Sequence, residues 1–365
     1  MNRLATLALA TLSLAAADAP FRDVTIQDRP MRCADVRRPP FLLTGLPFRD
    51  SPDAPLHRLP TNLTKADVNE GALGLSSNPS GAAVLLRTDS PVIGLISSPC
   101  TGAAMPHMPA TGVSAYDLYQ RLTDRPEPAE RFIANIRTVP GGALAHTGAQ
   151  PGKPIDLILY LPLYSRVDAL EIAVTPDARL EPPTPQRLRR PIVFYGSSIT
   201  QGGCCSRPGN NYTTMVCRAL DAPQVNLGFS GSAKGEPAIA KAIASLDAEL
   251  LVLDYDHNAP SPEHLRNTHE PFFRIIRQAR PTLPIVILSR PDTRNGGERR
   301  DIIRQTYENA VAAGDRHVYF INGDTLFSPA GTDFCTVDGC HPNDLGFYMM
   351  YTHVLPVVRQ ALGLK

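Results

Sequence analysis

The second half of the sequence alternates between short apolar runs and stretches that are compatible with helices. The apolar runs are PIVFYG (191–196), QVNLGF (224–229), ELLVLDY (249–255), PIVILS (284–289) and HVYFIN (317–322). Between the third and fourth runs, one helical face carries Leu265, Phe272 and Ile276. Strands that are apolar throughout and alternate with helices are typical of a parallel sheet covered on both faces. We therefore expect residues 191–365 to form an α/β domain around a parallel five-stranded sheet.

Residues 20–175 follow a different pattern, in which short apolar or alternating segments are separated by turn-forming residues. Strand character is evident at 81–98, 131–139 and 155–167, and clusters such as SSNPSG lie between such segments. Short strands with frequent turns predict an all-β sandwich. The following residues, 176–190, are rich in proline and arginine and show no periodicity, so we expect them to be a linker.

The first 19 residues have the order of regions found in a secretory signal peptide. Arg3 precedes an apolar stretch from Leu4 to Ala17, and small residues follow it. The stretch is shorter than the roughly 20 apolar residues that a membrane-spanning helix needs. We expect cleavage between Ala15 and Ala19, a secreted or periplasmic protein, and no integral membrane segment after cleavage.

Charge and cysteine content narrow the classes of partner and the redox setting. The formal net charge is +1, which gives no reason to expect a nucleic-acid or anionic-membrane partner. The seven cysteines suit an oxidising compartment but show no spacing typical of zinc sites. Cys335 and Cys340 could form a disulfide, and a strained bond between the adjacent Cys204 and Cys205 is the other local option. Unpaired thiols fit the sequence equally well.

Polar residues follow the apolar runs at the positions where the predicted strands end. In parallel sheets, ligands bind beyond the carboxyl ends of the strands, so these residues are candidates for a site. The first run is followed by Ser198, the second by Gly231 and the third by Asn258, while Asp338 and His341 lie near the C-terminus. Serine, histidine, a carboxylate, an asparagine and a glycine are the groups that acyl transfer requires.

Each of these residue types has a defined part in ester chemistry. Ser198 is a poor nucleophile until a base takes its proton, and His341 can serve as that base. Asp338 lies three residues before His341 and can orient the imidazole through Nδ1. The tetrahedral intermediate needs donors for its oxyanion, and the candidates are the backbone amides of Ser198 and Gly231 and the side chain of Asn258.

The order of these blocks resembles the SGNH (GDSL-type) hydrolase superfamily. The four blocks are Gly196-Ser197-Ser198, Gly231 in NLGFSG, Asn258 in DYDHNAP, and Asp338 with His341 in VDGCH. The usual aspartate before the nucleophile is Ser197 here. The resemblance implies a flavodoxin-like catalytic domain and a serine esterase that uses neither a cofactor nor a metal.

A second motif, AYDLY at 115–119, is similar to the GxDLY signature of a β-rich domain that precedes one esterase branch of this superfamily. Ala115 replaces the glycine of that signature, and GSSITQG and HPNDLGF are also familiar in the branch. The resemblance implies a jelly-roll-like sandwich ahead of the catalytic domain. It also implies a small-molecule or glycan ester as substrate, because members of the family often act on acylated sugars.

Several residues have alternative interpretations. Asp254, Asp256 and His257 could form a metal site, although a hydrogen-bond network at the strand end fits them better. Asp324 could orient the imidazole in place of Asp338, but nothing local ties it to His341. The remaining histidines are expected to be structural or surface residues: His57, His107, His146, His264, His269, His317 and His353. The motif residues Tyr116, Asp117 and Tyr119 are either core residues or contacts between the front domain and the catalytic rim.

The sequence supports one leading function and two rivals. The leading hypothesis is an exported serine esterase that removes small acyl groups such as acetyl from a carbohydrate. An acyltransferase would use the same acyl-enzyme and pass the acyl group to an alcohol instead of water. A non-catalytic glycan-binding protein is the third hypothesis, but it has no need for Ser198, His341 and Asp338 together.

Overall fold

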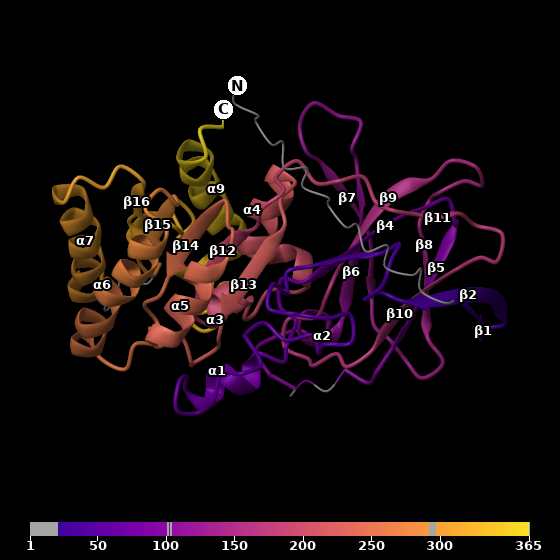
Figure 1. Ribbon diagram of the computed structural model, residues 1–365, viewed down its shortest axis with the longest axis horizontal. Coiled ribbons are helices and arrows are strands. Elements are labelled where there is room, and N and C mark those ends of the chain that lie inside the picture. The colour runs from indigo at the N-terminus through magenta and orange to yellow at the C-terminus, as the bar shows by residue number, and fades with distance from the viewer. Residues whose placement is uncertain (1–20, 101, 103, 292–296, 365) are drawn as a thin grey trace, which may run out of the picture.

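The computed structural model describes residues 21–100, 102, 104–291 and 297–364. The predicted signal peptide therefore lies outside the described residues. Figure 1 shows a β-rich part built from the first half of the chain beside an α/β part built from the second half. No helix of the described ranges is both long and apolar enough to cross a membrane.

The N-terminal half contains two antiparallel sheets. One has the strand order β1-β2-β10-β5-β8, and the other has the order β11-β4-β9-β6-β7 with β3 paired to β4. The elements of this half are β1 (Arg22–Ile26), β2 (Arg29–Asp35), β3 (Leu42–Thr44), α1 (Glu70–Leu75), β4 (Ala83–Thr88), β5 (Val92–Ser97), α2 (Ala110–Ser114), β6 (Tyr116–Arg121), β7 (Glu130–Ile136), β8 (Ala143–His146), β9 (Ile155–Tyr160), β10 (Leu170–Val174) and β11 (Leu180–Glu181).

Alternation along the strands builds two apolar layers in this half. Leu157 and Leu159 of β9 belong to the core between the two sheets. Ile158 and Tyr160 point the other way and form a second buried cluster with Tyr119. That outer cluster contacts the C-terminal half, because the Arg218 guanidinium lies 4.7 Å from the ring centre of Tyr119. The predicted antiparallel sandwich is confirmed.

The C-terminal half is built on a parallel sheet with the strand order β13-β12-β14-β15-β16. This is the flavodoxin-like order, in which successive strands are added first on one side of the first strand, β12, and then on its other side. Its elements are β12 (Ile192–Gly196), α3 (Ser198–Gln201), η1 (Pro208–Asn210), α4 (Tyr212–Leu220), β13 (Gln224–Gly228), α5 (Pro237–Ser245), β14 (Leu250–Asp254), α6 (Pro262–Ala279), β15 (Ile285–Leu288), α7 (Gly297–Ala312), β16 (Val318–Ile321), η2 (Gly323–Thr325), α8 (Thr332–Cys335) and α9 (Asp344–Ala361).

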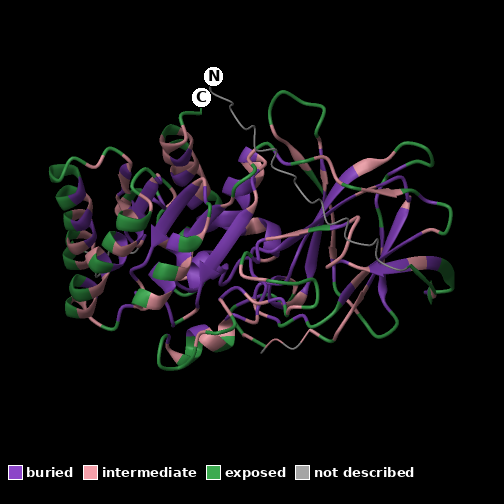
Figure 2. Ribbon diagram, viewed as in Figure 1, coloured by how far each residue is buried: buried purple, intermediate pink, exposed green. Residues whose placement is uncertain are grey.

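Both faces of the parallel sheet are covered by helices. Val193 and Tyr195 of β12 pack in one apolar cluster, together with residues of α5, α6 and α7. Ile192 and Phe194 of the same strand pack in a second cluster with residues of α4 and α9. The strands β12 to β15 are buried along their length, and in Figure 2 exposed residues lie on the outer surfaces of the helices. The predicted α/β architecture with five parallel strands is confirmed.

The two halves make polar and apolar contacts with each other. Arg58 is fully buried and donates to the carbonyl oxygens of Asn226 and Gly228 at 3.0 and 2.6 Å, at the end of β13. Burial lowers the pKa of its guanidinium to about 9. Leu59, also from the N-terminal half, belongs to the same apolar cluster as Tyr195. Within the stretch expected to be a linker, Leu180 and Glu181 form the short strand β11 against β4.

Candidate active site

Ser198 lies immediately beyond the end of β12, as the first residue of helix α3. Ser197 caps this short helix, because its hydroxyl accepts a hydrogen bond from the Ile199 backbone N–H at 3.2 Å. The strand ends at Gly196, where a Cβ atom would lie 2.1 Å from Thr200 Oγ1. A glycine at this position therefore lets the chain turn sharply from the strand into the helix and place Ser198 at the rim of the sheet.

His341 and Asp338 lie beside Ser198 and form a continuous chain of polar contacts with it. Ser198 Oγ is 2.9 Å from His341 Nε2, and His341 Nδ1 is 2.7 Å from Asp338 Oδ2. The two residues share one tight loop, which the hydrogen bond from Val337 N–H to the His341 carbonyl closes at 3.0 Å. The structure thus brings Ser198 into contact with His341, which lies 143 residues later in the chain, and His341 into contact with Asp338.

The surroundings of Asp338 keep its carboxyl group ionised. Partial burial acts to raise its pKa, but the His341 backbone N–H, the His341 imidazole and the Cys340 N–H outweigh burial and bring the pKa to about 2. An ionised carboxylate only accepts hydrogen bonds, so Asp338 Oδ2 faces a protonated Nδ1. In the neutral imidazole, Nε2 then has a free lone pair and can accept the hydroxyl hydrogen of Ser198.

Three hydrogen-bond donors lie just beyond the ends of adjacent strands: the backbone amides of Ser198 and Gly231 and the side-chain amide of Asn258. Gly231 follows β13 with φ at +67°, and a Cβ atom there would meet nothing within 4 Å, so the site is open at this residue. Asn258 follows β14, and its Oδ1 accepts from the Ala233 N–H at 3.3 Å, which leaves its Nδ2 to donate elsewhere. Across the described ranges, no acceptor lies within bonding distance of Asn258 Nδ2 or of the Ser198 and Gly231 backbone amides.

The carboxylates at the end of β14 have separate partners instead of converging. Asp254 accepts from Thr200 Oγ1 and from the Tyr212 hydroxyl, each at 2.9 Å, and burial raises the pKa of its carboxyl to about 7. Asp256 accepts from the Arg290 backbone N–H at 3.1 Å. His257 lies with Nδ1 3.7 Å from Cys340 Sγ. No metal-binding group of three such residues exists among the residues described.

Asp324, the alternative partner for His341, is engaged elsewhere. Its carboxylate forms an ion pair with the Arg300 guanidinium, which comes from α7. Asp338 is therefore the carboxylate that contacts the imidazole of His341 in this structure.

The motif in the N-terminal half contacts the loop that follows Ser198. Tyr116 is fully buried in the sandwich core. Asp117 instead accepts from the Gly209 N–H at 2.7 Å and from Arg207 Nη1 at 3.0 Å, and the Tyr119 hydroxyl also contacts Arg207. Tyr116 is thus a core residue, Asp117 contacts the loop after Ser198, and Tyr119 both belongs to a buried cluster and contacts that loop.

Two side chains near Ser198 come from the N-terminal half and carry no sequence signal. The Tyr164 hydroxyl donates to the Ser198 carbonyl at 3.3 Å. His107 is exposed, as expected for a surface histidine, but its ring centre lies 5.9 Å from that of His341, a proximity that the sequence did not indicate. Only the tertiary packing of the two halves brings them together, because they lie 34 and 234 residues from their respective partners.

The cysteines near the site are thiols in this structure. Cys205 donates from Sγ to the carbonyl oxygens of Gly202 and Arg207, at 3.1 and 3.3 Å, and Cys204 is buried with φ at +84°. The vicinal disulfide is therefore absent, and the turn is held by hydrogen bonds. Cys335 is likewise a buried thiol, so it does not pair with Cys340.

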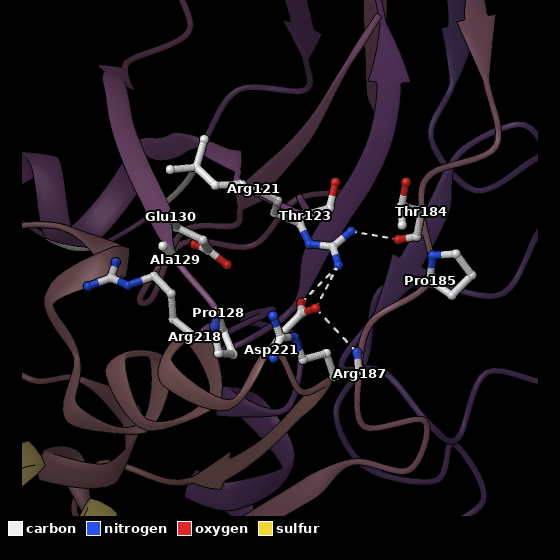
Figure 3. A pocket seen from close by; sticks show the side chains of 11 residues that line it. Arg121, Thr123, Pro128, Ala129, Glu130, Thr184, Pro185, Arg187, Arg218 and Asp221 are labelled. Carbon is white, nitrogen blue, oxygen red and sulfur yellow. Dashed lines mark hydrogen bonds and ion pairs between the residues drawn. The ribbon is translucent and has the colours of Figure 1, made fainter. Parts of the chain in front are cut away.

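A small polar cavity between the two halves is distinct from this site. It has a volume of about 80 Å³ and is lined by residues such as Arg121, Glu130, Arg218 and Asp221. Figure 3 shows Arg121 directed toward Asp221 and the Thr184 carbonyl, with distances of 2.8 and 2.7 Å. Burial raises the pKa of Glu130 to about 7. The ion pair between Arg121 and Asp221 joins the two halves, so the cavity is part of the contact between them.

Two family models match the chain, one in each half. Residues 189–359 match the GDSL-like Lipase/Acylhydrolase family. Residues 34–180 match the N-terminus of Esterase_SGNH_hydro-type proteins, the GxDLY family. A comparison with curated proteins found no match.

Solved structures share the fold across most of the chain. A protein from Bacteroides ovatus ATCC 8483, described as a GDSL-like lipase, has a TM-score of 0.79 and 27% identity, over 92% of this chain and 99% of its own. The salicylyl-acyltransferase SsfX3 from a tetracycline biosynthetic pathway has a TM-score of 0.73 and 21% identity, over 92% and 99%. A family two carbohydrate esterase from Clostridium thermocellum has a TM-score of 0.54 and 14% identity, over 78% and 93%.

Proposed function

Because the chain belongs to the SGNH (GDSL-type) hydrolase superfamily, in the esterase branch with a GxDLY-type N-terminal domain, we propose that it cleaves carboxylic esters through a Ser198-His341-Asp338 triad. The observation that carries this proposal is the unbroken chain of contacts, 2.9 Å from Ser198 to His341 and 2.7 Å from His341 to Asp338. On this account residues 191–365 are the catalytic domain.

The geometry supports a two-step reaction. His341 Nε2 takes the proton of Ser198 while Oγ attacks the ester carbonyl, and Asp338 stabilises the imidazolium that forms. The protonated imidazole then gives its proton to the leaving alcohol, and an acyl-enzyme remains on Ser198. Water, activated by His341 in the same way, attacks the acyl-enzyme and releases the acid.

We assign the oxyanion hole to the Ser198 and Gly231 backbone amides and to Asn258 Nδ2. The support for this assignment is that all three are donors without an acceptor in the described structure, at adjacent strand ends around the nucleophile. Donors that are already oriented toward the developing negative charge stabilise the transition state without further reorganisation.

We propose an acylated carbohydrate as the substrate, with acetyl as the acyl group. The open surface at Gly231 and the partly exposed His341 suit a substrate larger than a simple ester. The fold shared with a family two carbohydrate esterase, whose structure contains cellohexaose, is consistent with this substrate class. The order of regions in residues 1–19 supports export to a secreted or periplasmic location.

The test is acetate release from acetylated oligosaccharides by the wild-type protein, Ser198→Ala and Ser197→Ala. We expect activity in the wild type and in Ser197→Ala, and a loss of several orders of magnitude in Ser198→Ala. Adding an acceptor alcohol separates hydrolysis from acyl transfer, since a transferase forms the new ester in preference to free acid. Protein that binds the oligosaccharide but cleaves neither it nor p-nitrophenyl acetate would refute the esterase assignment.

A further inference from the structure

The loop before α2 brings one exposed histidine of the N-terminal half to the proposed catalytic rim. His107 is exposed, whereas the next residue, Met108, is buried in the apolar cluster that also contains Cys204 and Ile199. Thr111 of α2 donates to the Ser206 carbonyl at 2.6 Å. The loop is therefore fixed to the turn that follows Ser198, and the His107 ring is held 5.9 Å from the His341 ring.

An open groove of about 590 Å³ has His107 in its lining. The lining also includes Pro106 and Pro109 from the same loop, and Val337 and Leu345 from the C-terminal half. Val337 and Leu345 are each 44% exposed, which leaves their apolar surfaces available to a ligand. The volume is within the range of small-ligand sites, and it is sufficient for a single ring.

The other polar side chains along this groove already have partners within the protein. Asn343 Oδ1 accepts from the Gly346 N–H at 3.0 Å, and its Nδ2 donates to the Phe334 carbonyl at 2.7 Å. The Asp344 carboxylate accepts from the Ser206 N–H at 2.8 Å and from Asn210 Nδ2 at 2.9 Å. A ligand in the groove would therefore be held mainly by apolar contact, with the imidazole of His107 as an added flat surface.

The direction of the reaction decides which part of an ester enters the groove. In the tetrahedral intermediate, the oxyanion must face the donors at Gly231 and Asn258. The leaving oxygen must face His341 Nε2, because that atom supplies its proton. The His107 ring contacts the His341 ring, and the Val337 N–H donates to the His341 carbonyl at 3.0 Å, so the groove adjoins His341 and, on the proposed mechanism, the side of the alcohol.

We propose that this groove is the alcohol-binding subsite and that His107 determines specificity within it, by packing against a ring of the alcohol. This inference rests on the proposed function. The alcohol it fits presents an apolar ring face next to the ester, as the C–H face of a sugar ring does, and keeps its hydroxyl groups toward solvent. The chain contains no tryptophan, and the imidazole of His107 supplies a flat ring at this groove.

The test compares two acetyl esters whose alcohols differ in shape but are similar in acidity, cyclohexylmethyl acetate and ethyl acetate. We expect wild-type kcat/KM to favour the ring-bearing ester by about tenfold or more. His107→Ala should reduce that preference by about three- to tenfold, and His107→Phe should retain it. The hydrolysis rate of the acetyl-enzyme should be unchanged in both variants, because both esters give the same acyl-enzyme and the alcohol has left.

The control is His146→Ala, which removes an exposed histidine of β8, in the sheet with the order β1-β2-β10-β5-β8. The inference is overturned if His107→Ala keeps the wild-type preference, or if it slows both esters and the hydrolysis of the acetyl-enzyme by the same factor. Equal turnover of both esters by the wild type and by Ser198→Ala would instead refute the proposed function, and the subsite with it. Comparing Ser198→Ala with His107→Ala therefore distinguishes these two failures.

Discussion

Replacing Asp338 with asparagine tests the proposed triad through the position of a single proton. In the structure, Asp338 Oδ1 accepts from the backbone N–H groups of Cys340 and His341 at 2.9 and 2.7 Å, and Oδ2 accepts from His341 Nδ1 at 2.7 Å. Asparagine has one oxygen, and the two backbone donors require it at the Oδ1 position. Its NH₂ group then faces Nδ1 and donates to it.

The consequence is the wrong tautomer of His341. A neutral imidazole that accepts at Nδ1 carries its proton on Nε2, which lies 2.9 Å from Ser198 Oγ and can then no longer act as the base. A misplaced tautomer in a Ser-His-Asp triad costs about 10³- to 10⁴-fold in kcat, equivalent to about 4–5.5 kcal/mol of transition-state stabilisation. Asp338→Ala has no NH₂ group to fix the tautomer, so we expect it to lose no more activity than Asp338→Asn.

The assay is kcat/KM for p-nitrophenyl acetate, with the thermal midpoint as a check on folding and ¹⁵N chemical shifts of the His341 ring to identify the tautomer. The reasoning is refuted if Asp338→Asn keeps activity within about tenfold of the wild type while the shifts place the proton on Nε2. It is also refuted if Asp338→Ala is much less active than Asp338→Asn although both are folded.

Three further predictions concern the surroundings of the nucleophile. Asn258→Ala removes a proposed oxyanion donor and should lower kcat by about 10²- to 10³-fold with little change in KM, so a change confined to KM in steady-state kinetics would contradict the assignment. Ser197→Ala removes the cap of α3 and should lower the free energy of unfolding by about 1 kcal/mol in urea titrations while the protein stays active. The raised pKa of Asp254, about 7, means that the folded protein keeps a proton that the unfolded chain has released, so stability falls as pH rises from about 4 to 7. Asp254→Asn should make the thermal midpoint fall less over that interval than in the wild type; an equal fall in both would contradict this origin.

The parallel sheet and the position of Ser198 could be predicted because local patterns determine both. A strand that is buried on both faces must be apolar throughout, so β12 and β14 are visible as uninterrupted runs in the sequence. The ends of parallel strands meet at one edge, which brings Ser198 near Asn258. The three-residue spacing of Asp338 and His341 likewise predicts a local contact, which the structure contains. Their catalytic roles stay a prediction.

The contributions of the N-terminal half could not be predicted, because they depend on how the two halves pack. His107 lies in a short loop between prolines and shows no pattern that points to His341. Arg58 is a single arginine in an irregular segment, and its partners are backbone carbonyl groups, which carry no side-chain signature. The short strand β11 was also hidden, because two residues are too few to show a strand pattern beside so many prolines.

The most direct test of the account is to identify the residue that becomes covalently modified. Purified protein would be treated with a fluorophosphonate, which labels activated serine nucleophiles, and the modified peptide would be mapped by mass spectrometry. We predict a single label on Ser198 in the wild type and in Ser197→Ala, and no label in Ser198→Ala. A label on another residue, or equal labelling of Ser198→Ala, would contradict the claim that Ser198 is the nucleophile.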